Sequence, residues 1–148
     1  MHPIDWLIVV VYFVWIVSDG LRRTKDADKV EEVNRYNAAC AAARAAAGEG
    51  RVTKPLDEAG KAELRKKAVK WLAADVSGWK GLLDATMGVP PDHMIEVLAW
   101  AKQDGDLACI RDAEFVSKLP ADEQKSVNAL WTDLDALLAK ARAGQPAK

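Results

Sequence analysis

The sequence has very few residues of the kinds that carry metal or redox chemistry. In 148 residues it has 2 cysteines, Cys40 and Cys109, and 2 histidines, His2 and His93. No CxxC pair occurs, and the histidines lie far apart and in no ligand spacing, so a zinc site has no support. Both cysteines lie in alanine-rich or apolar surroundings. We therefore expect them to be buried small side chains rather than a disulfide or a metal site.

The chain also lacks an excess of charge of either sign and any arrangement typical of catalysis. The formal net charge is −1, from 21 Lys and Arg against 22 Asp and Glu, and the charges are well mixed. No global field is therefore present to recruit nucleic acid. No nucleophile, base and orienting group can be assembled from the spacing, and we expect Asp133 and Asp135 on solvated helix faces. These patterns predict no enzyme activity, no cofactor, no nucleic-acid partner and no evident small-molecule substrate.

Long apolar runs are missing from the sequence with one exception near its start. Trp6 to Val17 is an unbroken apolar run of about 12 residues, too short by itself for a hydrocarbon core of about 30 Å. Extended to residues 4–21, it gives a helix of about 27 Å, which spans a bilayer with slight thinning. Trp6 and Trp15 lie towards opposite ends with Tyr12 between them, and such rings favour the membrane interface.

Basic residues lie on one side of this segment. Arg22, Arg23 and Lys25 follow it, whereas His2 is the one side chain with basic character before it. The positive-inside rule then puts the C-terminal side in the cytoplasm. We therefore predict a single-pass anchor in the inner (cytoplasmic) membrane, in contact with lipid, with the rest of the chain in the cytoplasm.

Two other interpretations of this segment stay open. A cleaved secretory signal needs basic residues before the apolar run and a small-residue exit after it, and Ser18, Asp19 and Gly20 make a poor exit. A soluble domain that buries this helix in its core is the other interpretation, because about 10 to 14 apolar residues are typical of a buried helix.

Beyond the apolar run, the spacing of apolar residues is helical throughout. No segment shows the period-two alternation of a half-buried strand, so we expect an all-α fold. The predicted organisation is a membrane anchor helix at residues 1–24, a helical module at residues 25–143 and a frayed tail at residues 144–148.

Glycine and proline mark the expected helix ends. The first helix of the module runs from Asp26 to Ala47 and is stopped by Gly48 and Gly50, the third begins at Pro91 or Asp92, and the last opens at Pro120. The last helix has the clearest stripe of apolar residues at three-four spacing, which comprises Val127, Leu130, Trp131, Leu134, Leu137, Leu138 and Ala141.

The second helix carries a basic cluster beside its apolar stripe. Its members are Lys61, Arg65, Lys66, Lys67 and Lys70. We expect a solvated face, because Glu58 and Glu63 are close enough to offset the charge, with a contact to anionic lipid as the alternative.

The connector before the last helix is acidic and partly apolar. Asp104, Asp106 and Asp112 lack the terminal Glu and the spacing of a calcium loop, so we expect them to cap helices and turns. The apolar side chains that we expect to point inwards are Leu107, Ile110, Phe115, Val116 and Leu119.

Two parts of the chain resemble known families. The first 32 residues resemble the first transmembrane helix of the sodium:solute symporter family, through Asp5-Trp6-Leu7-Ile8-Val9, Tyr12-Phe13, Gly20-Leu21 and Arg22-Arg23-Thr24-Lys25. In that family the sodium and substrate sites lie on later helices. The resemblance therefore implies a membrane helix and not transport by this chain.

Residues 34–142 resemble the last tetratricopeptide-type (TPR) region at the end of large bacterial serine/threonine protein kinases and related multidomain proteins. The matching pieces are Arg35-Tyr36-Asn37-Ala38-Ala39-Cys40, the helix around Leu64 to Trp79, Trp100 with Asp104-Gly105-Asp106-Leu107-Ala108, Ile110-Arg111-Asp112, and Leu119-Pro120 with Leu130-Trp131. The resemblance implies an interaction scaffold made of a helical hairpin and capping helices. It does not imply kinase activity, because the Gly-rich loop and the catalytic motifs of kinases are missing.

A single hairpin of this type leaves one end face uncovered, because about three repeats are needed to bury a stable core. We expect Tyr36, Ala39, Ala43 and Trp71 to form an exposed face that docks a helix of another protein or a second copy. The leading hypothesis is a membrane-anchored scaffold for protein contacts. The alternative is a non-functional remnant in which the start of a symporter is joined to the end of a kinase-associated repeat region after Glu32.

Overall fold

The computed structural model describes residues 34–49, 55–85 and 90–144, all of which belong to one compact unit, Val33–Lys148. This part of the chain is helical and contains no strand, which confirms the all-α prediction for it. The helices are α2 (Arg35–Ala46), α3 (Glu58–Asp84), α4 (Pro91–Gln103), the short 3-10 helix η3 (Gly105–Ile110), α5 (Ala113–Val116) and α6 (Ala121–Ala143).

The predicted anchor at residues 4–21 lies outside the described residues, together with Trp6, Tyr12, Trp15, Arg22 and Arg23. The last four residues of the expected frayed tail, 145–148, lie outside them too. Within the three described ranges, no helix is both long enough and apolar enough to cross a bilayer.

The helix ends show ordinary capping chemistry, and those at Gly48 and Pro91 were predicted. The Asp57 side chain caps α3 by accepting a hydrogen bond of 2.8 Å from the backbone N–H of Gly60. Pro91 is the first residue of α4, where its missing N–H costs nothing. At the end of α2, Gly48 takes a φ of +82°, a left-handed conformation that suits glycine.

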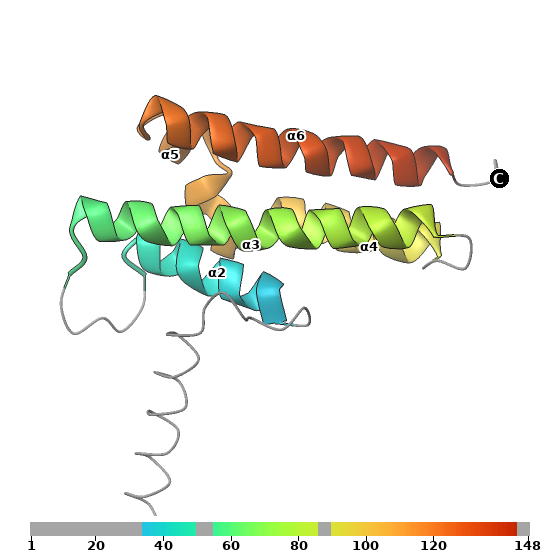
Figure 1. Ribbon diagram of the computed structural model, residues 1–148, viewed down its shortest axis with the longest axis horizontal. Coiled ribbons are helices and arrows are strands. Elements are labelled where there is room, and N and C mark those ends of the chain that lie inside the picture. The colour runs from blue at the N-terminus through green and yellow to red at the C-terminus, as the bar shows by residue number, and fades with distance from the viewer. Residues whose placement is uncertain (1–33, 50–54, 86–89, 145–148) are drawn as a thin grey trace, which may run out of the picture. The chain divides into compact units, whose positions relative to one another are not determined.

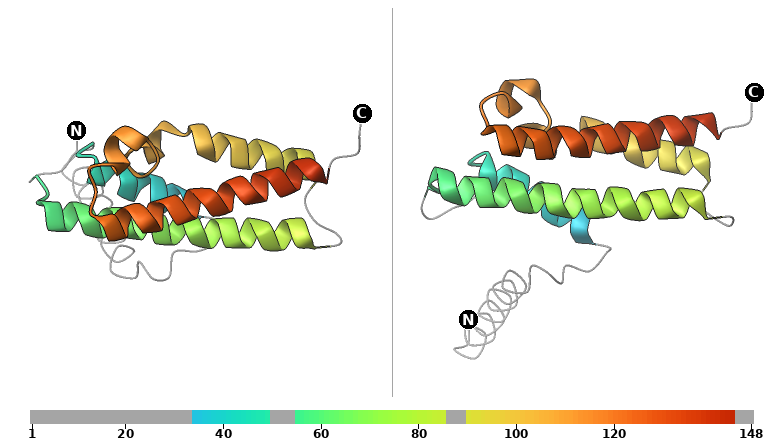
Figure 2. Two further views of the ribbon diagram at one scale, coloured as in Figure 1. Left: turned by 90° about the horizontal axis from the view of Figure 1, so that it is seen from above. Right: turned by 45° about the horizontal axis from the view of Figure 1, so that its top comes forward.

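Four helices account for most of the packing (Figure 1). α2 and α4 run opposite to α3, whereas α6 runs in the same direction as α3. α6 packs against both α3 and α4, and α2 packs against α3 and η3. The two turned views in Figure 2 show the same arrangement, with η3 and α5 at one end of α6.

The core lies where the apolar stripes of these helices meet. Its largest fully buried side chains are Leu72, Leu98, Leu107, Ile110 and Leu134. The predicted stripe of α6 is confirmed, since all its members are buried except Trp131, which is partly buried. Cys40 and Cys109 are buried and are not joined in a disulfide, as expected.

Phe115 is an exception to the expected inward set, because 43% of its surface is exposed. α5 is a single turn that buries Val116, and successive helical residues point about 100° apart, so Phe115 turns outwards. The Lys118 ammonium lies 5.9 Å from the centre of its ring.

Arg65 is a second correction, because it is buried and does not belong to a solvated basic face. Its position, three residues before Ala68 and seven before Leu72, places it on the buried stripe of α3. Its side chain forms an ion pair with Glu123 of α6.

Candidate interaction site

An open groove on the surface is bounded by three helices that are distant in sequence. It has a volume of about 510 Å³ and is lined by Tyr36, Trp79, His93, Glu96, Val97 and Trp100. We call this set the aromatic groove. Tyr36 comes from the first turn of α2, Trp79 from α3 and the other four residues from α4. Trp100 leaves 61% of its surface exposed.

Three aromatic rings form a row along this groove, with Tyr36 in the middle. The centre of its ring lies 6.2 Å from that of Trp79 and 5.5 Å from that of Trp100, with an angle of 41° between ring planes in both pairs. Both distances are in the range in which aromatic pairs attract. The Tyr36 and Trp79 rings are partly buried against the core, so they give the exposed Trp100 ring a fixed neighbour.

Asp104, at the end of α4, fixes the position of the Tyr36 ring. The Tyr36 hydroxyl donates a hydrogen bond of 2.8 Å to Asp104 Oδ2, and the Cys40 thiol donates to the same oxygen at 3.6 Å. The other oxygen, Oδ1, accepts from the backbone N–H of Asp106 at 3.0 Å. Asp104 therefore caps η3, as the sequence indicated, and also holds α2 against the end of α4.

The buried and acidic surroundings disfavour negative charge on the Tyr36 and Cys40 side chains. Burial, and then the hydrogen bond to Asp104, raise the pKa of the Tyr36 hydroxyl above its usual value. Burial and the Asp104 charge raise the pKa of the Cys40 thiol to about 12. Both groups therefore stay protonated at neutral pH and act as hydrogen-bond donors.

Cys40, Asp104 and Asp106 bring three possible metal-ligand atoms within 4.8 Å of one another. The Cys40 thiol is engaged by Asp104 Oδ2, and Asp104 Oδ1 is engaged by the backbone N–H of Asp106. The arrangement is therefore better explained as the cap that joins α2, α4 and η3.

The structure separates the four residues of the predicted interaction face. Tyr36 lines the aromatic groove. Ala39 and Ala43 do not belong to an exposed face, because both are fully buried. Their small side chains lie one turn apart in α2, which packs against α3 and η3, and the thiol of Cys109 in η3 donates to the Ala43 carbonyl at 3.0 Å. Trp71 is partly buried against the core and is not among the groove-lining residues.

Sequence reasoning did not identify Trp79 and Trp100 as site residues. Trp79 lies on the apolar stripe of α3, and a residue on such a stripe is normally expected to pack in the core. Trp100 lies beside the apolar stripe of α4 and not on it, and a tryptophan off the stripe is the signal that could have identified an exposed ring.

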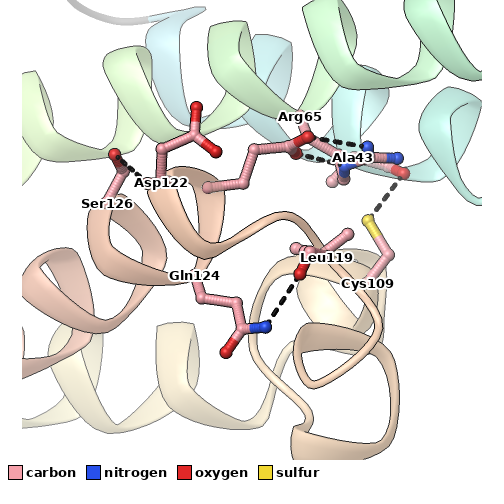
Figure 3. Close-up of polar contacts among 8 residues, drawn as sticks. Ala43, Arg65, Cys109, Leu119, Asp122, Gln124 and Ser126 are labelled. Carbon is pink, nitrogen blue, oxygen red and sulfur yellow. Dashed lines mark hydrogen bonds and ion pairs between the residues drawn. The ribbon is translucent and has the colours of Figure 1, made fainter.

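A second polar region joins α3 to α6, and its charges are paired within the fold. Arg65 Nε lies 2.7 Å from Glu123 Oε2, and its Nη2 lies 3.1 Å from Oε1, in a two-pronged pair that we call the α3–α6 ion pair. The hydrogen bond to Glu123 raises the pKa of Arg65. Figure 3 shows the two contacts of Arg65 and, beside them, the contact from Cys109 to Ala43.

The remaining aromatic group near this region is also satisfied internally. The indole N–H of Trp131 donates a hydrogen bond of 2.6 Å to the carbonyl of Ile110. The Gln124 amide donates to the Leu119 carbonyl at 2.8 Å (Figure 3). No buried side-chain nitrogen or oxygen in the described ranges lacks a partner.

Comparison with known proteins assigns neither region a role. No protein family model, curated protein or solved structure matches this chain. The resemblances to the symporter helix and to the TPR-type region therefore stay predictions.

Proposed function

We propose that this chain is a membrane-anchored helical module that binds another protein at the aromatic groove. The observation that carries the proposal is the exposure of Trp100, which leaves 61% of its surface in water beside two further aromatic rings. Tryptophan and tyrosine are the residues that most often dominate binding energy at protein interfaces. Covering the groove with a partner removes this apolar surface from water.

The rigidity of the groove supports binding more than a flexible aromatic patch would. Tyr36 is held by Asp104 and by the two neighbouring rings, so little side-chain entropy remains to be lost on docking. The three contributing helices are also joined through the core, which fixes the spacing of the rings. Truncation of such a central ring costs about 2 kcal/mol or more of binding free energy.

The relation to TPR-type scaffolds is part of the same proposal and concerns the α2–α3 hairpin. Its support is the antiparallel packing of α2 on α3 through small residues such as Ala39 and Ala43 (Figure 1). α2 has 12 residues and α3 has 27, whereas the two helices of a 34-residue TPR repeat have similar lengths. The hairpin is therefore proposed as a variant unit, with α4 and α6 as its cap.

Membrane attachment is proposed from the apolar segment at residues 4–21, with the basic residues after it directing the module to the cytoplasm. The test is labelling of intact cells with a membrane-impermeant maleimide, after a new cysteine is placed at His2 or at Ala147. The native thiols of Cys40 and Cys109 are buried, so they contribute little background. Labelling at position 2 alone supports the proposed topology, and labelling at position 147 contradicts it.

Protein binding is tested by purifying the tagged full chain from its native cells in a non-ionic detergent. We expect a partner to co-purify in a fixed ratio with the wild type and with Phe115→Ala, which removes an exposed ring outside the groove. We expect Trp100→Ala to lower its recovery about tenfold or more. Equal recovery with all three proteins, or no partner with any, would contradict the proposal. A wild-type dimer that Trp100→Ala dissociates would identify a second copy as the occupant.

A further inference from the structure

The charges around the aromatic groove indicate what kind of side chain it accepts. Glu96 lines the groove with 79% of its side chain exposed, and His93 Nδ1 lies 4.0 Å from its carboxylate. Of the described residues that line the groove, none is a lysine or an arginine. Arg35, the cation next to Tyr36 in sequence, forms an ion pair of 2.9 Å with Asp75 on α3. The rim is therefore acidic.

A second negative charge lies behind the central ring. Asp104 is held by three neutral donors, namely the Tyr36 hydroxyl, the Cys40 thiol and the Asp106 N–H. A phenol that donates to a carboxylate gains electron density in its ring, and an electron-rich ring face attracts cations more strongly. The Tyr36 ring is therefore suited to a positive group.

We propose that the groove takes the guanidinium group of an arginine on the partner protein, stacked against the rings of Trp100 and Tyr36 and paired with the Glu96 carboxylate. This inference rests on the proposed function, since it names the chemistry of the docked partner. Guanidinium is planar, so it stacks on an aromatic face while its edge donates hydrogen bonds to a carboxylate.

Other occupants satisfy only part of the groove. An aliphatic side chain covers Trp100 but takes the rim carboxylate of Glu96 out of water without a partner, which costs free energy. A lysine ammonium supplies the charge but lacks the flat face that matches the rings, and it is more strongly hydrated than guanidinium. Arginine can stack on the rings and pair with the carboxylate at the same time.

The test uses two small probes of almost the same shape, Nα-acetyl-argininamide and Nα-acetyl-citrullinamide, which differ in charge. Each is titrated into the full chain in a non-ionic detergent, and the shifts of the Trp79 and Trp100 indole N–H signals are followed by NMR. In Trp100→Ala, the Trp79 signal is the readout. We expect the arginine probe to bind about fivefold more tightly than the citrulline probe. We expect Glu96→Gln to reduce that preference and Trp100→Ala to abolish binding, whereas Phe115→Ala leaves it unchanged.

A third probe, Nα-acetyl-leucinamide, separates the failure of this inference from the failure of the proposed function. Equal binding of the arginine and citrulline probes, or tighter binding of the leucine probe, overturns the arginine proposal. In either case the groove still binds partner side chains, and protein docking stands. If no probe shifts the Trp100 signal, the arginine proposal is overturned as well, and the co-purification with Trp100→Ala decides protein docking by itself.

Discussion

The α3–α6 ion pair and the aromatic groove each contain a carboxylate, but the first is paired with Arg65 within the fold and the second faces solvent. In the α3–α6 ion pair the Arg65 and Glu123 side chains are 10% and 19% exposed, and each satisfies the other. In the groove, Trp100 and Glu96 lie in solvent, with 61% and 79% exposed. Groups that are satisfied within the fold contribute to stability, whereas exposed rings beside an unneutralised carboxylate are available to a partner.

This contrast predicts that changes in the core and at the α3–α6 ion pair lower stability, whereas changes in the groove lower binding. The largest loss is expected at the centre of the core. Leu134→Ala removes a fully buried side chain from α6, and we expect the free energy of unfolding to fall by about 3 kcal/mol. Urea denaturation of the full chain, followed by circular dichroism, measures the change. A loss below about 1 kcal/mol would show that α6 does not pack as described.

The α3–α6 ion pair is expected to come next. Arg65→Met leaves the Glu123 carboxylate partly buried without its partner, and we expect a loss of about 2 kcal/mol. The double change Arg65→Met with Glu123→Leu is expected to recover most of this loss, because no charge is then left behind. As a control, Lys61→Met breaks the exposed pair with Glu58 and is expected to change stability by less than about 0.5 kcal/mol.

Alkaline pH is expected to weaken the groove side of the module through Cys40. Its pKa is raised to about 12 in the folded chain, against about 8.5 for an unperturbed thiol, so the unfolded chain loses this proton first. Stability is therefore full below about pH 8.5 and falls as the pH rises towards 12, by about 2 kcal/mol near pH 10. Cys40→Ala should remove this part of the pH dependence. Parallel stability curves for the two proteins from pH 8 to 11 would refute the assignment.

The smallest effect on stability is expected at the groove itself. Trp100→Ala removes an exposed ring, and we expect the free energy of unfolding to change by less than about 0.5 kcal/mol. The same urea titration provides the measurement. A loss close to that of Leu134→Ala would mean that Trp100 belongs to the core, and the distinction between the two regions would fail.

The long helices and most of the core could be predicted from the sequence, because each has its own local signal. The three-four spacing from Val127 to Ala141 is a pattern within one helix. The prolines at the starts of α4 and α6 likewise mark the helix that they begin. The buried state of Cys40 and Cys109 was predicted from their apolar neighbours for the same reason.

The features that the sequence did not predict depend on contacts between distant residues. In the sequence, Arg65 is one of several neighbouring basic residues, which suggests a solvated face. Its ion-pair partner in the fold, Glu123, lies 58 positions away in the sequence. Ala39 and Ala43 were expected on an open face because alanine does not indicate which side of a helix is covered. The groove forms where Tyr36 of α2, Trp79 of α3 and Trp100 of α4 come together in the fold. The spacing of residues within a single helix does not predict such contacts between helices.

Site-specific photo-cross-linking tests the central claim, that the aromatic groove docks a protein, most directly. A photoreactive benzoylphenylalanine replaces Trp100 in one full-length variant and Phe115 in another, and both are irradiated in their native cells. We expect one discrete protein adduct from position 100, weakened by added Nα-acetyl-argininamide, and none from position 115. Equal adducts from the two positions, or none from position 100, would contradict the account.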